Sequence, residues 1–412
     1  MVSLQRFIRT VRMVFASALA AKAAAKGLRP QSPPARPPES GRLRSVWQPA
    51  QAGFAVAQQP LGAASAATRS PARILALLLV AALPLLAACI GQTTVKSYDG
   101  PVAQVSLALD WTPNTNHTGV FVALQKGYYQ QNGIDLKLTP YSSSVYPEQL
   151  VGAGKAEFGI SFPESVTTFR AQGVPIVSIG AIIEHNTSAL VTLKSSGLDS
   201  VAKLTGKRYA GFGAPYEQPV IEQALTCGGA SNPSFQNITT SLDPVEALKS
   251  KQFDFAWVYE GWEVIQAQRE GLQLNVFPLK DYCLPDYSSP VIVTSQRMIE
   301  QHPDIIKRFL AATSEGYTYA IQHPKAAADM LIQGAPKGTF DDTGLVYASQ
   351  NYLSPLYAAG AKCWGQQTLD KWTNYPRFMY NHHAILDANG NPITTPPDYA
   401  AAFTNTFLPP CQ

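Results

Sequence analysis

The sequence has 412 residues, 46% hydrophobic and 15% charged, so it can form a substantial core and is long enough for two or three domains. The net charge of +4 is unevenly placed: residues 1–88 hold 11 Lys or Arg and one acidic residue, whereas the rest holds 21 basic and 27 acidic residues. An acidic body argues against nucleic acid as a partner, because phosphates are neutralised by a basic face.

The first 89 residues are predicted to direct export. Residues 1–70 are rich in Ala, Pro, Arg and Ser, and the next segment, 71–89, contains an apolar run of 13 residues, 74–86. This run is shorter than the roughly 20 residues of a membrane-spanning helix and is typical of a signal-peptide core. Its Leu-Ala-Ala-Cys ending resembles the bacterial lipobox, which implies lipidation of Cys89 and anchoring on the outer face of the cytoplasmic membrane, in the periplasm or at the cell surface. Because a lipobox normally lies near the start of a precursor, we expect residues 1–70 to be disordered or an upstream extension from a mis-called start.

The segment after residue 102 alternates β-rich runs with amphipathic helical runs. Strands are predicted at 105–111, 134–141, 157–162 and 174–183, with helices at 117–133, 147–156 and 164–173 between them. A second series follows, with strands at 207–213, 253–259 and 272–278 and helices at 219–229 and 262–271. The chain then returns through a strand at 289–295, a helix at 304–322, and a mainly helical, aromatic-rich C-terminal part. This βαβ succession predicts parallel sheets with helices on both faces.

The two series predict two α/β lobes joined by two crossings. We expect lobe 1 to comprise 102–189 and 285–412, and lobe 2 to comprise 190–284, each with a mainly parallel sheet. Ligands of open parallel sheets bind beyond the carboxyl ends of the strands, so the site is expected in the cleft between the lobes. Hinge closure around a ligand is the standard motion of two-lobed binding proteins.

Polar and aromatic side chains follow five of the predicted strands. A flat ligand is expected there, held by stacking on aromatic faces and by hydrogen bonds in the ring plane. In this hypothesis Glu260 accepts from an exocyclic amine and Trp111 stacks on the ring. The candidate ligand-binding residues are Trp111, Asn114, Asn116, His117, Ser161, Phe162, Glu164, His185, Asn186, Tyr216, Glu217, Tyr259, Glu260 and Trp262.

Four cysteines follow Cys89, an even number that permits disulfides in an exported protein. We expect Cys227–Cys283 and Cys363–Cys411, because each pair lies within one lobe; four free thiols are the alternative. Neither CxxC spacing nor a His/Cys cluster of zinc-finger type occurs, so no metal is expected.

Several segments together resemble one family of binding proteins. They are LDWTPNTNHTGVFVALQKGYY, GKAEFGIS, HNTSALVTLKSSGL and DFAWVYEGWE, and the similarity extends over about residues 102–405. The sequence is similar to the thiamine-pyrimidine branch of the extracytoplasmic solute-binding proteins, which is related to sulfonate, nitrate and riboflavin receptors. This resemblance implies the type II periplasmic-binding fold, a monomer, and a pyrimidine of the hydroxymethyl or formylaminomethyl type delivered to an ABC permease and its ATPase. Riboflavin, another flat heterocycle or a sulfonate is the alternative ligand.

The same branch contains the yeast-type hydroxymethylpyrimidine phosphate synthase. That chemistry requires a Lys that holds an aldehyde as a Schiff base and a His four residues later. The matching segment, GISFPES, has Ser161 and Ser165 in those places. The Gly-rich turn for phosphate is matched by FGAPYEQP, which presents Glu217, and a carboxylate there would repel a phosphate. We therefore expect a receptor with neither catalytic residues nor a cofactor, and the synthase is the less favoured reading.

Overall fold

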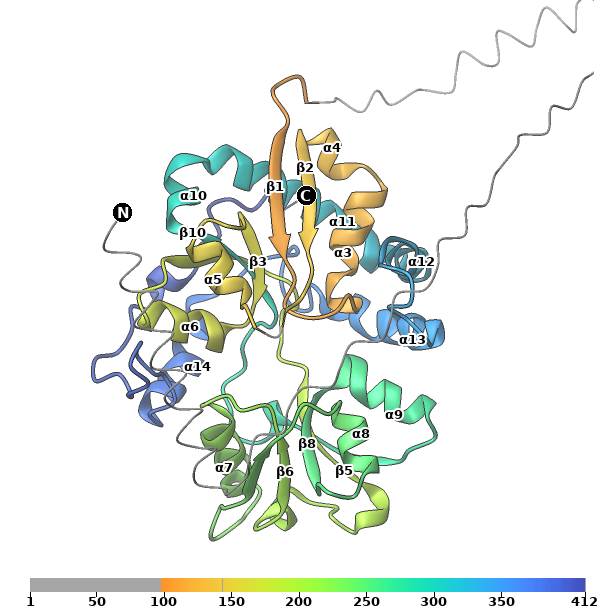
Figure 1. Ribbon diagram of the computed structural model, residues 1–412, viewed down its shortest axis with the longest axis vertical. Coiled ribbons are helices and arrows are strands. Elements are labelled where there is room, and N and C mark those ends of the chain that lie inside the picture. The colour runs from red at the N-terminus through yellow and green to blue at the C-terminus, as the bar shows by residue number, and fades with distance from the viewer. Residues whose placement is uncertain (1–97, 143, 412) are drawn as a thin grey trace, which may run out of the picture. The chain divides into compact units, whose positions relative to one another are not determined.

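Two five-stranded sheets form the framework of the protein in a computed structural model, which describes residues 98–142 and 144–411 (Figure 1). The first sheet has the order β2-β1-β3-β10-β4 and the second β7-β6-β8-β5-β9. The strands are β1 Ala103–Ala108, β2 Ile134–Thr139, β3 Phe158–Ser161, β4 Ile176–Ala181, β5 Ser188–Leu193, β6 Arg208–Gly211, β7 Gln236–Thr239, β8 Phe255–Tyr259, β9 Leu274–Pro278 and β10 Val291–Ser295. The expected extension at 1–70, the signal peptide at 71–89 and Cys89 lie outside the described residues.

Both sheets are mixed and mainly parallel, as predicted, because four strands of each run the same way and one runs the opposite way. β1 is parallel to β2 and β3, but β10 is antiparallel to β3 and β4. In the second sheet β6 is parallel to β7 and β8, but β5 is antiparallel to β8 and β9. β5 and β10 are the first strands after each crossing, so they start at the edge where the other strands end and run the opposite way. The sequence analysis also missed β5, β7 and the short helix α8, and placed the start of lobe 2 at residue 190, inside β5.

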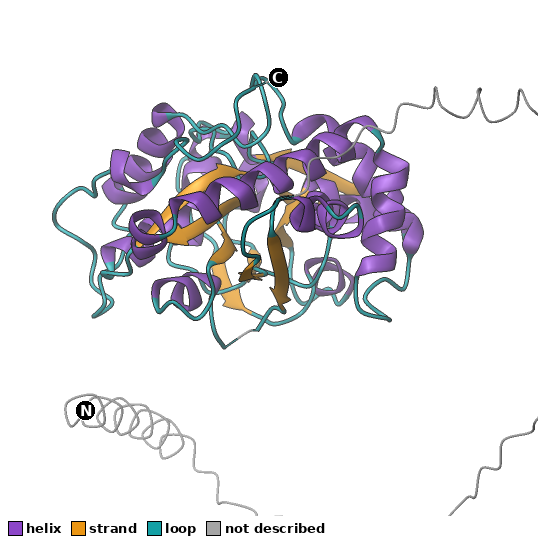
Figure 2. Cartoon of the chain, turned by 90° about the horizontal axis from the view of Figure 1, so that it is seen from above, coloured by secondary structure: helices purple, strands orange, loops and turns teal. Residues whose placement is uncertain are grey.

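Helices surround the strands (Figure 2). With the first sheet lie α3 Thr118–Gln125, α4 Tyr128–Gln131, α5 Pro147–Gly152, α6 Pro163–Ala171, α10 Gln296–Gln301, α11 Pro303–Gln322, α12 Pro324–Gly334 and α13 Thr343–Leu353. With the second lie α7 Glu217–Cys227, α8 Pro244–Lys249 and α9 Ile265–Arg269, and α14 Leu369–Asn381 comes near the end of the chain. The helix predicted over 117–133 is divided at Gly127, whose φ of 72° interrupts it between α3 and α4.

The core of the first lobe fixes the loop that follows β1. Ile306, Phe309 and Tyr317 recur on one face of α11 and are fully buried, as the apolar spacing predicted. The Tyr317 hydroxyl donates to the carbonyl of Asn116 (2.6 Å), and the Tyr357 hydroxyl donates to that of Thr115 (2.6 Å). These bonds attach the short helix η2, Thr115–His117, to the interior, so this edge of the sheet is rigidly supported.

The C-terminal part of the chain contributes to the core of the second lobe. Tyr375 and Met379 of α14 are buried in the same apolar cluster as Leu190, Tyr209 and Phe255. The structure pairs the four cysteines as Cys227–Cys283 and Cys363–Cys411, the pairing that the sequence analysis favoured. Within the part of the chain that the structure describes, every helix is too short or too polar to cross a membrane.

Candidate functional site

The loop after β1 is organised by a buried histidine. The Asn114 backbone N–H donates to Nδ1 of His117 (3.1 Å), which leaves the proton on Nε2 to be donated to Asp110 (2.8 Å). Asn114 Oδ1 accepts from the backbone N–H of Asn116 (2.9 Å). His117 is fully buried, so it orients Asp110, while the Asn114 side chain closes the loop on the backbone of Asn116.

Trp111 lies in the same loop after β1, and it is exposed to solvent. Its side chain is 54% exposed and packs on Tyr141, with ring centroids 4.6 Å apart. An exposed ring supported on one side can take a flat ligand on the other. The structure therefore leaves Trp111 in a position consistent with stacking.

Glu164 is the centre of the candidate site. Ser161 ends β3, Phe162 precedes α6, and Glu164 lies in the first turn of α6 directly after Pro163. The residue is 2% exposed, and its Oε2 has no hydrogen-bond partner among the described residues. Burial raises the pKa of Glu164 from 4.5 to about 7. A buried carboxylate oxygen without a partner is costly, and such groups are typical of functional sites.

The charge of this carboxylate acts on four tyrosines from different parts of the chain. Tyr216 follows β6 and Tyr259 ends β8 in the second lobe, Tyr287 lies in the second crossing, and Tyr375 belongs to α14. Burial and then the charge of Glu164 raise the pKa of all four hydroxyls well above 10. The charge of Glu164 therefore acts on phenols from both lobes.

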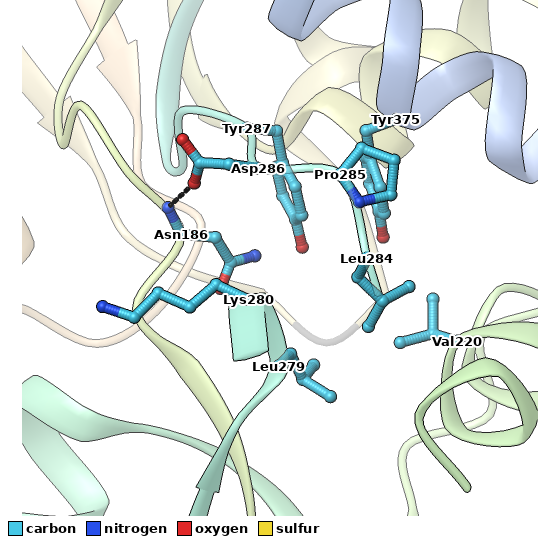
Figure 3. A pocket seen from close by; sticks show the side chains of 9 residues that line it. All are labelled: Asn186, Val220, Leu279, Lys280, Leu284, Pro285, Asp286, Tyr287 and Tyr375. Carbon is cyan, nitrogen blue, oxygen red and sulfur yellow. Dashed lines mark hydrogen bonds between the residues drawn. The ribbon is translucent and has the colours of Figure 1, made fainter. Parts of the chain in front are cut away.

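Tyr287 and Tyr375 form a stacked pair beside a small cavity. Their ring centroids are 3.8 Å apart and their planes differ by 7°, and both hydroxyls point the same way (Figure 3). The Tyr375 hydroxyl is buried and has no partner within the described structure. The cavity is also lined by Asn186, whose Oδ1 accepts from the backbone N–H of Ser188 (2.6 Å). The pair thus presents a face and two hydroxyl groups beside the Glu164 site.

Two further carboxyl groups have a raised pKa, Glu148 in the first lobe and Glu263 in the second. Glu148, in the first turn of α5, accepts from the Ser161 hydroxyl, and Glu263 accepts from the Tyr259 N–H (2.9 Å). Burial raises the pKa of each from 4.5 to about 7. Glu148, Glu263, Tyr287 and Tyr375 were not among the residues predicted from the sequence. Glu148 carried a signal, since Pro147-Glu148 repeats the Pro163-Glu164 pattern at a helix start.

Glu217 is not placed to bind a ligand, contrary to the expectation from sequence. Its carboxylate accepts from the N–H groups of Phe212 (2.8 Å), Gly213 (2.7 Å) and Ala214 (2.7 Å). The Tyr209 hydroxyl is a fourth donor (2.8 Å), and Glu217 is fully buried. Four donors use the acceptor capacity of a carboxylate, so this side chain closes the loop after β6.

Glu260 and Trp262 also lie apart from the Glu164 group. They belong to the short helix η5, Glu260–Val264, where Glu260 accepts from the hydroxyl of Tyr352 in α13 (3.3 Å). Trp262 packs on Phe340, with ring centroids 6.3 Å apart, in an apolar cluster formed with α12 and α13. The sequence spacing could not separate these residues from Tyr259, because they follow it within three residues and their contacts with α12 and α13 arise from tertiary packing.

His185 and Asn186 belong to a polar network at the crossings between the lobes. Asp286 accepts from the Asn186 N–H (3.1 Å) and lies 2.6 Å from Nδ1 of His185. Lys371 of α14 is paired with Glu184 at 2.8 Å. These contacts tie the two crossings and α14 together, so they support the hinge. Within the described residues no group of three or more His, Cys, Asp or Glu is placed to hold a metal ion.

Comparison with known proteins identifies the family. A sequence profile described as NMT1/THI5 like matches residues 114–327. The chain belongs to the NMT1/THI5-like family. The relatives are named for different activities. The chain is 25% identical to a formylaminopyrimidine-binding protein of Halalkalibacterium halodurans over 269 residues, which are 65% of this chain and 80% of the relative. It is also 25% identical, over 57% of this chain and 75% of the relative, to a 4-amino-5-hydroxymethyl-2-methylpyrimidine phosphate synthase of Legionella pneumophila.

The chain is also similar to a protein named for another ligand. The riboflavin-binding protein RibY of Chloroflexus aurantiacus is 25% identical over 79% of this chain and 95% of its own length. Among solved structures, the alkanesulfonate-binding protein of Xanthomonas axonopodis matches 74% of this chain and 99% of its own, with a TM-score of 0.56 and 13% identity. This likeness confirms the predicted two-lobed periplasmic-binding fold.

Proposed function

We propose that this family member is an extracytoplasmic solute-binding protein of an ABC importer, and that it captures a thiamine-precursor pyrimidine. The observation that carries the proposal is the buried Glu164 carboxylate, with one free oxygen, inside a group of tyrosines from both lobes. The name of the Halalkalibacterium halodurans relative supports the ligand class.

An aminopyrimidine matches this arrangement chemically. Its exocyclic amine donates hydrogen bonds, its ring nitrogens accept them, and its flat face stacks on aromatic rings. Because the pKa of Glu164 is raised to about 7, the carboxyl is shared between its charged and neutral forms near neutral pH. The charged form accepts a hydrogen bond from the exocyclic amine at the free oxygen of Glu164, a bond to an ionised group that glutamine cannot make. This bond would satisfy the free oxygen and orient the ring between the tyrosines.

A receptor fits the site better than the synthase of the same family. Ser161 donates its hydroxyl proton to Glu148, and Ser165 lies in α6 beside Glu164. Neither hydroxyl can form an imine, which requires an amine. The groups described around Glu164 are carboxyls and phenols, which bind and orient a ligand by hydrogen bonds.

Capture requires the lobes to come together around the ligand, and contacts between them support such a closure. The backbone carbonyl of Gly261 in η5 accepts from the Ser349 hydroxyl of α13. Arg269 of α9 donates to both carboxylate oxygens of Asp342, at 2.6 and 2.9 Å. These bonds join η5 and α9 of the second lobe to α13 and the residue before it. When the hinge opens, Trp111 of the first lobe and Tyr216 of the second would move relative to these contacts.

Calorimetric titration of the wild type with hydroxymethyl- and formylaminomethyl-aminopyrimidine tests this function. We expect one site per chain, and about 10- to 100-fold weaker binding in Glu164→Gln, since hydrogen bonds to charged groups contribute roughly 1.5–3 kcal/mol. Glu260→Gln is the matched control and is expected to bind as the wild type does. Weakening by Glu260→Gln alone would place recognition at η5 and contradict the role of Glu164. Tighter binding of riboflavin or of an alkanesulfonate would contradict the pyrimidine assignment.

The lipid anchor belongs to the same proposal. The lipobox ending at Cys89 would hold the receptor beside its permease, because acyl chains contribute about 0.8 kcal/mol per buried methylene. Cys89→Ser is expected to shift the protein from the membrane fraction to the soluble fraction, and mass spectrometry of the mature N-terminus should show an acylated Cys89. A membrane fraction unchanged by Cys89→Ser would contradict the anchor.

A further inference from the structure

The contact between η5 of the second lobe and α13 of the first is centred on a buried serine. The Ser349 hydroxyl donates to the backbone carbonyl of Gly261 in η5. The same oxygen lies 2.5 Å from the hydroxyl oxygen of Thr115 in η2, and neither Ser349 nor Thr115 is more than 1% exposed. One buried pair of hydroxyl groups therefore links the segment that follows β1 to the segment that follows β8.

The backbone of η5 is packed closely on the first lobe. A Cβ atom at Gly261 would lie 2.7 Å from a methyl carbon of Leu353 in α13, so the glycine allows this close approach. Trp262, the next residue, packs on a buried apolar cluster from α3, α12 and α13. Separating η5 from α13 would expose these apolar groups to water, at a cost in free energy. Because apolar contacts of this kind restrict the motion of two domains, we expect the contact to persist when the hinge moves.

The buried centre of the contact contributes more than its polar rim. The ion pair between Arg269 and Asp342 lies at the rim, where the two side chains are 40% and 48% exposed. Exposed ion pairs contribute little to stability, because water and salt screen them. The hydrogen bonds of Ser349 are shielded from water, so their loss leaves the Gly261 carbonyl without a partner.

The residues that Ser349 links are connected directly to groups of the candidate site. Thr115 belongs to η2, in which His117 holds Asp110 at 2.8 Å. Gly261 lies two residues after Tyr259, whose N–H donates to Glu263 (2.9 Å). Because both connections are short and hydrogen-bonded, the position of Tyr259 relative to the loop after β1 depends on Ser349.

We propose that Ser349 is a positioning residue, the centre of a noncovalent joint between the lobes that is separate from the two crossings. The joint, formed by Thr115, Ser349 and Gly261, keeps the ends of β1 and β8 together while the rest of the cleft opens and closes. This inference rests on the proposed function, because it concerns how the same site is assembled. It implies that the half of the site at the ends of β1 and β8 is arranged before the ligand arrives.

A crosslink across the joint tests whether the contact persists. A Cβ atom at Gly261 would lie 2.9 Å from Cγ of Leu353, which is close enough for a disulfide between cysteines at these two positions. Combining Gly261→Cys with Leu353→Cys also removes the leucine atoms that the new Cβ would meet. The oxidised protein is expected to bind and release hydroxymethyl-aminopyrimidine as its own reduced form does. An oxidised protein that neither takes up nor releases the ligand until it is reduced would overturn the inference.

A pair of serine variants tests whether Ser349 positions the site. Ser349→Ala is expected to weaken binding of hydroxymethyl-aminopyrimidine about tenfold in calorimetric titrations, as for the loss of a buried hydrogen bond. Ser354→Ala is the matched control, because Ser354 is also buried and donates to the carbonyl of Ala320 (3.0 Å), but entirely within the first lobe. We expect Ser354→Ala to lower the free energy of unfolding similarly and to leave the affinity unchanged. Equal affinities of the two variants would overturn the inference.

Variants of Thr115 decide the question if Ser349→Ala does not fold. Thr115→Val removes the hydroxyl group and keeps the shape, whereas Thr115→Ser keeps the hydroxyl group. Weaker binding by Thr115→Val alone supports the joint, and equal binding by both variants overturns it.

Failure of the proposed function would be recognised separately. If the wild type binds neither hydroxymethyl- nor formylaminomethyl-aminopyrimidine, the ligand assignment fails, and the joint is then tested by hydrogen exchange without a ligand. The backbone amides of η5 are expected to exchange faster in Ser349→Ala than in Ser354→Ala, because the joint opens more often. Equal exchange in the two variants would overturn the inference.

Discussion

Glu164→Gln should make the empty receptor more stable at alkaline pH although it weakens ligand binding. Glu164 is buried, and burial raises its pKa from the ordinary 4.5 to about 7. Below pH 4.5 this carboxyl is protonated in both the folded and the unfolded protein, and the stabilising contribution of its raised pKa is then fully present. This contribution is lost as the pH rises through 7, because the buried carboxyl must then ionise. At about 1.4 kcal/mol per pH unit, ionisation of Glu164 costs the folded state about 3 kcal/mol by pH 8. A neutral glutamine of nearly the same shape removes that cost.

Urea unfolding of the ligand-free proteins at pH 5 and pH 8 measures the effect. The free energy of unfolding of Glu164→Gln is expected to exceed that of the wild type by about 2–3 kcal/mol at pH 8, with a much smaller difference at pH 5. The pH 5 measurement is the internal control, because most of the wild-type carboxyl is then protonated. A difference of equal size at both pH values, or a variant less stable than the wild type at pH 8, would refute the reasoning. Saturation with ligand should reduce the gap, since the ligand binds only the wild type tightly.

Two further predictions concern stability away from the site. A methyl group at Gly316 of α11 would overlap the backbone carbonyl of Gly119 in α3, so Gly316→Ala is expected to lower the free energy of unfolding by about 1–3 kcal/mol. Thr318→Ala, an exposed change in the same helix, should alter it by less than about 0.5 kcal/mol, and equal effects of the two would contradict the close approach. Replacing Cys227 and Cys283 together by Ser removes a crosslink between residues 56 apart and is expected to cost about 4 kcal/mol, measured by urea unfolding. A wild type whose unfolding midpoint is unaffected by a reducing agent would contradict that crosslink.

Much of the framework followed from local patterns in the sequence. The apolar spacing of residues 304–322 predicted α11, and the alternation of β-rich and amphipathic runs predicted two α/β lobes. β5 was missed because its sequence, SALVTL, is buried throughout most of its length and lacks the polar alternation of a half-exposed strand. The direction of β5 and β10 also depends on the crossings, which local patterns do not describe.

The site was only partly predictable, for a different reason. Glu164 follows β3 of the first sheet, whereas Tyr216 follows β6 and Tyr259 ends β8 of the second. The strand ends of both sheets were expected to face one cleft, so sequence reasoning could group these residues. Tyr287 and Tyr375 follow no strand, and their stacking depends on the packing of α14 against the second lobe. Side chains brought in by tertiary packing of distant segments leave no local signal.

Glu164 and Glu217 show what distinguishes a ligand-binding carboxylate from a structural one. Both follow a strand, lie in the first turn of a helix and are buried, so the sequence ranked them alike. Glu217 has four donors and no capacity for another, whereas Glu164 keeps an oxygen without a partner. Burying that oxygen costs stability, and a ligand that donates to it recovers the cost as binding free energy. The same imbalance therefore explains both the expected gain in stability of Glu164→Gln and its expected loss of affinity, and a variant that showed one without the other would separate Glu164 from the ligand.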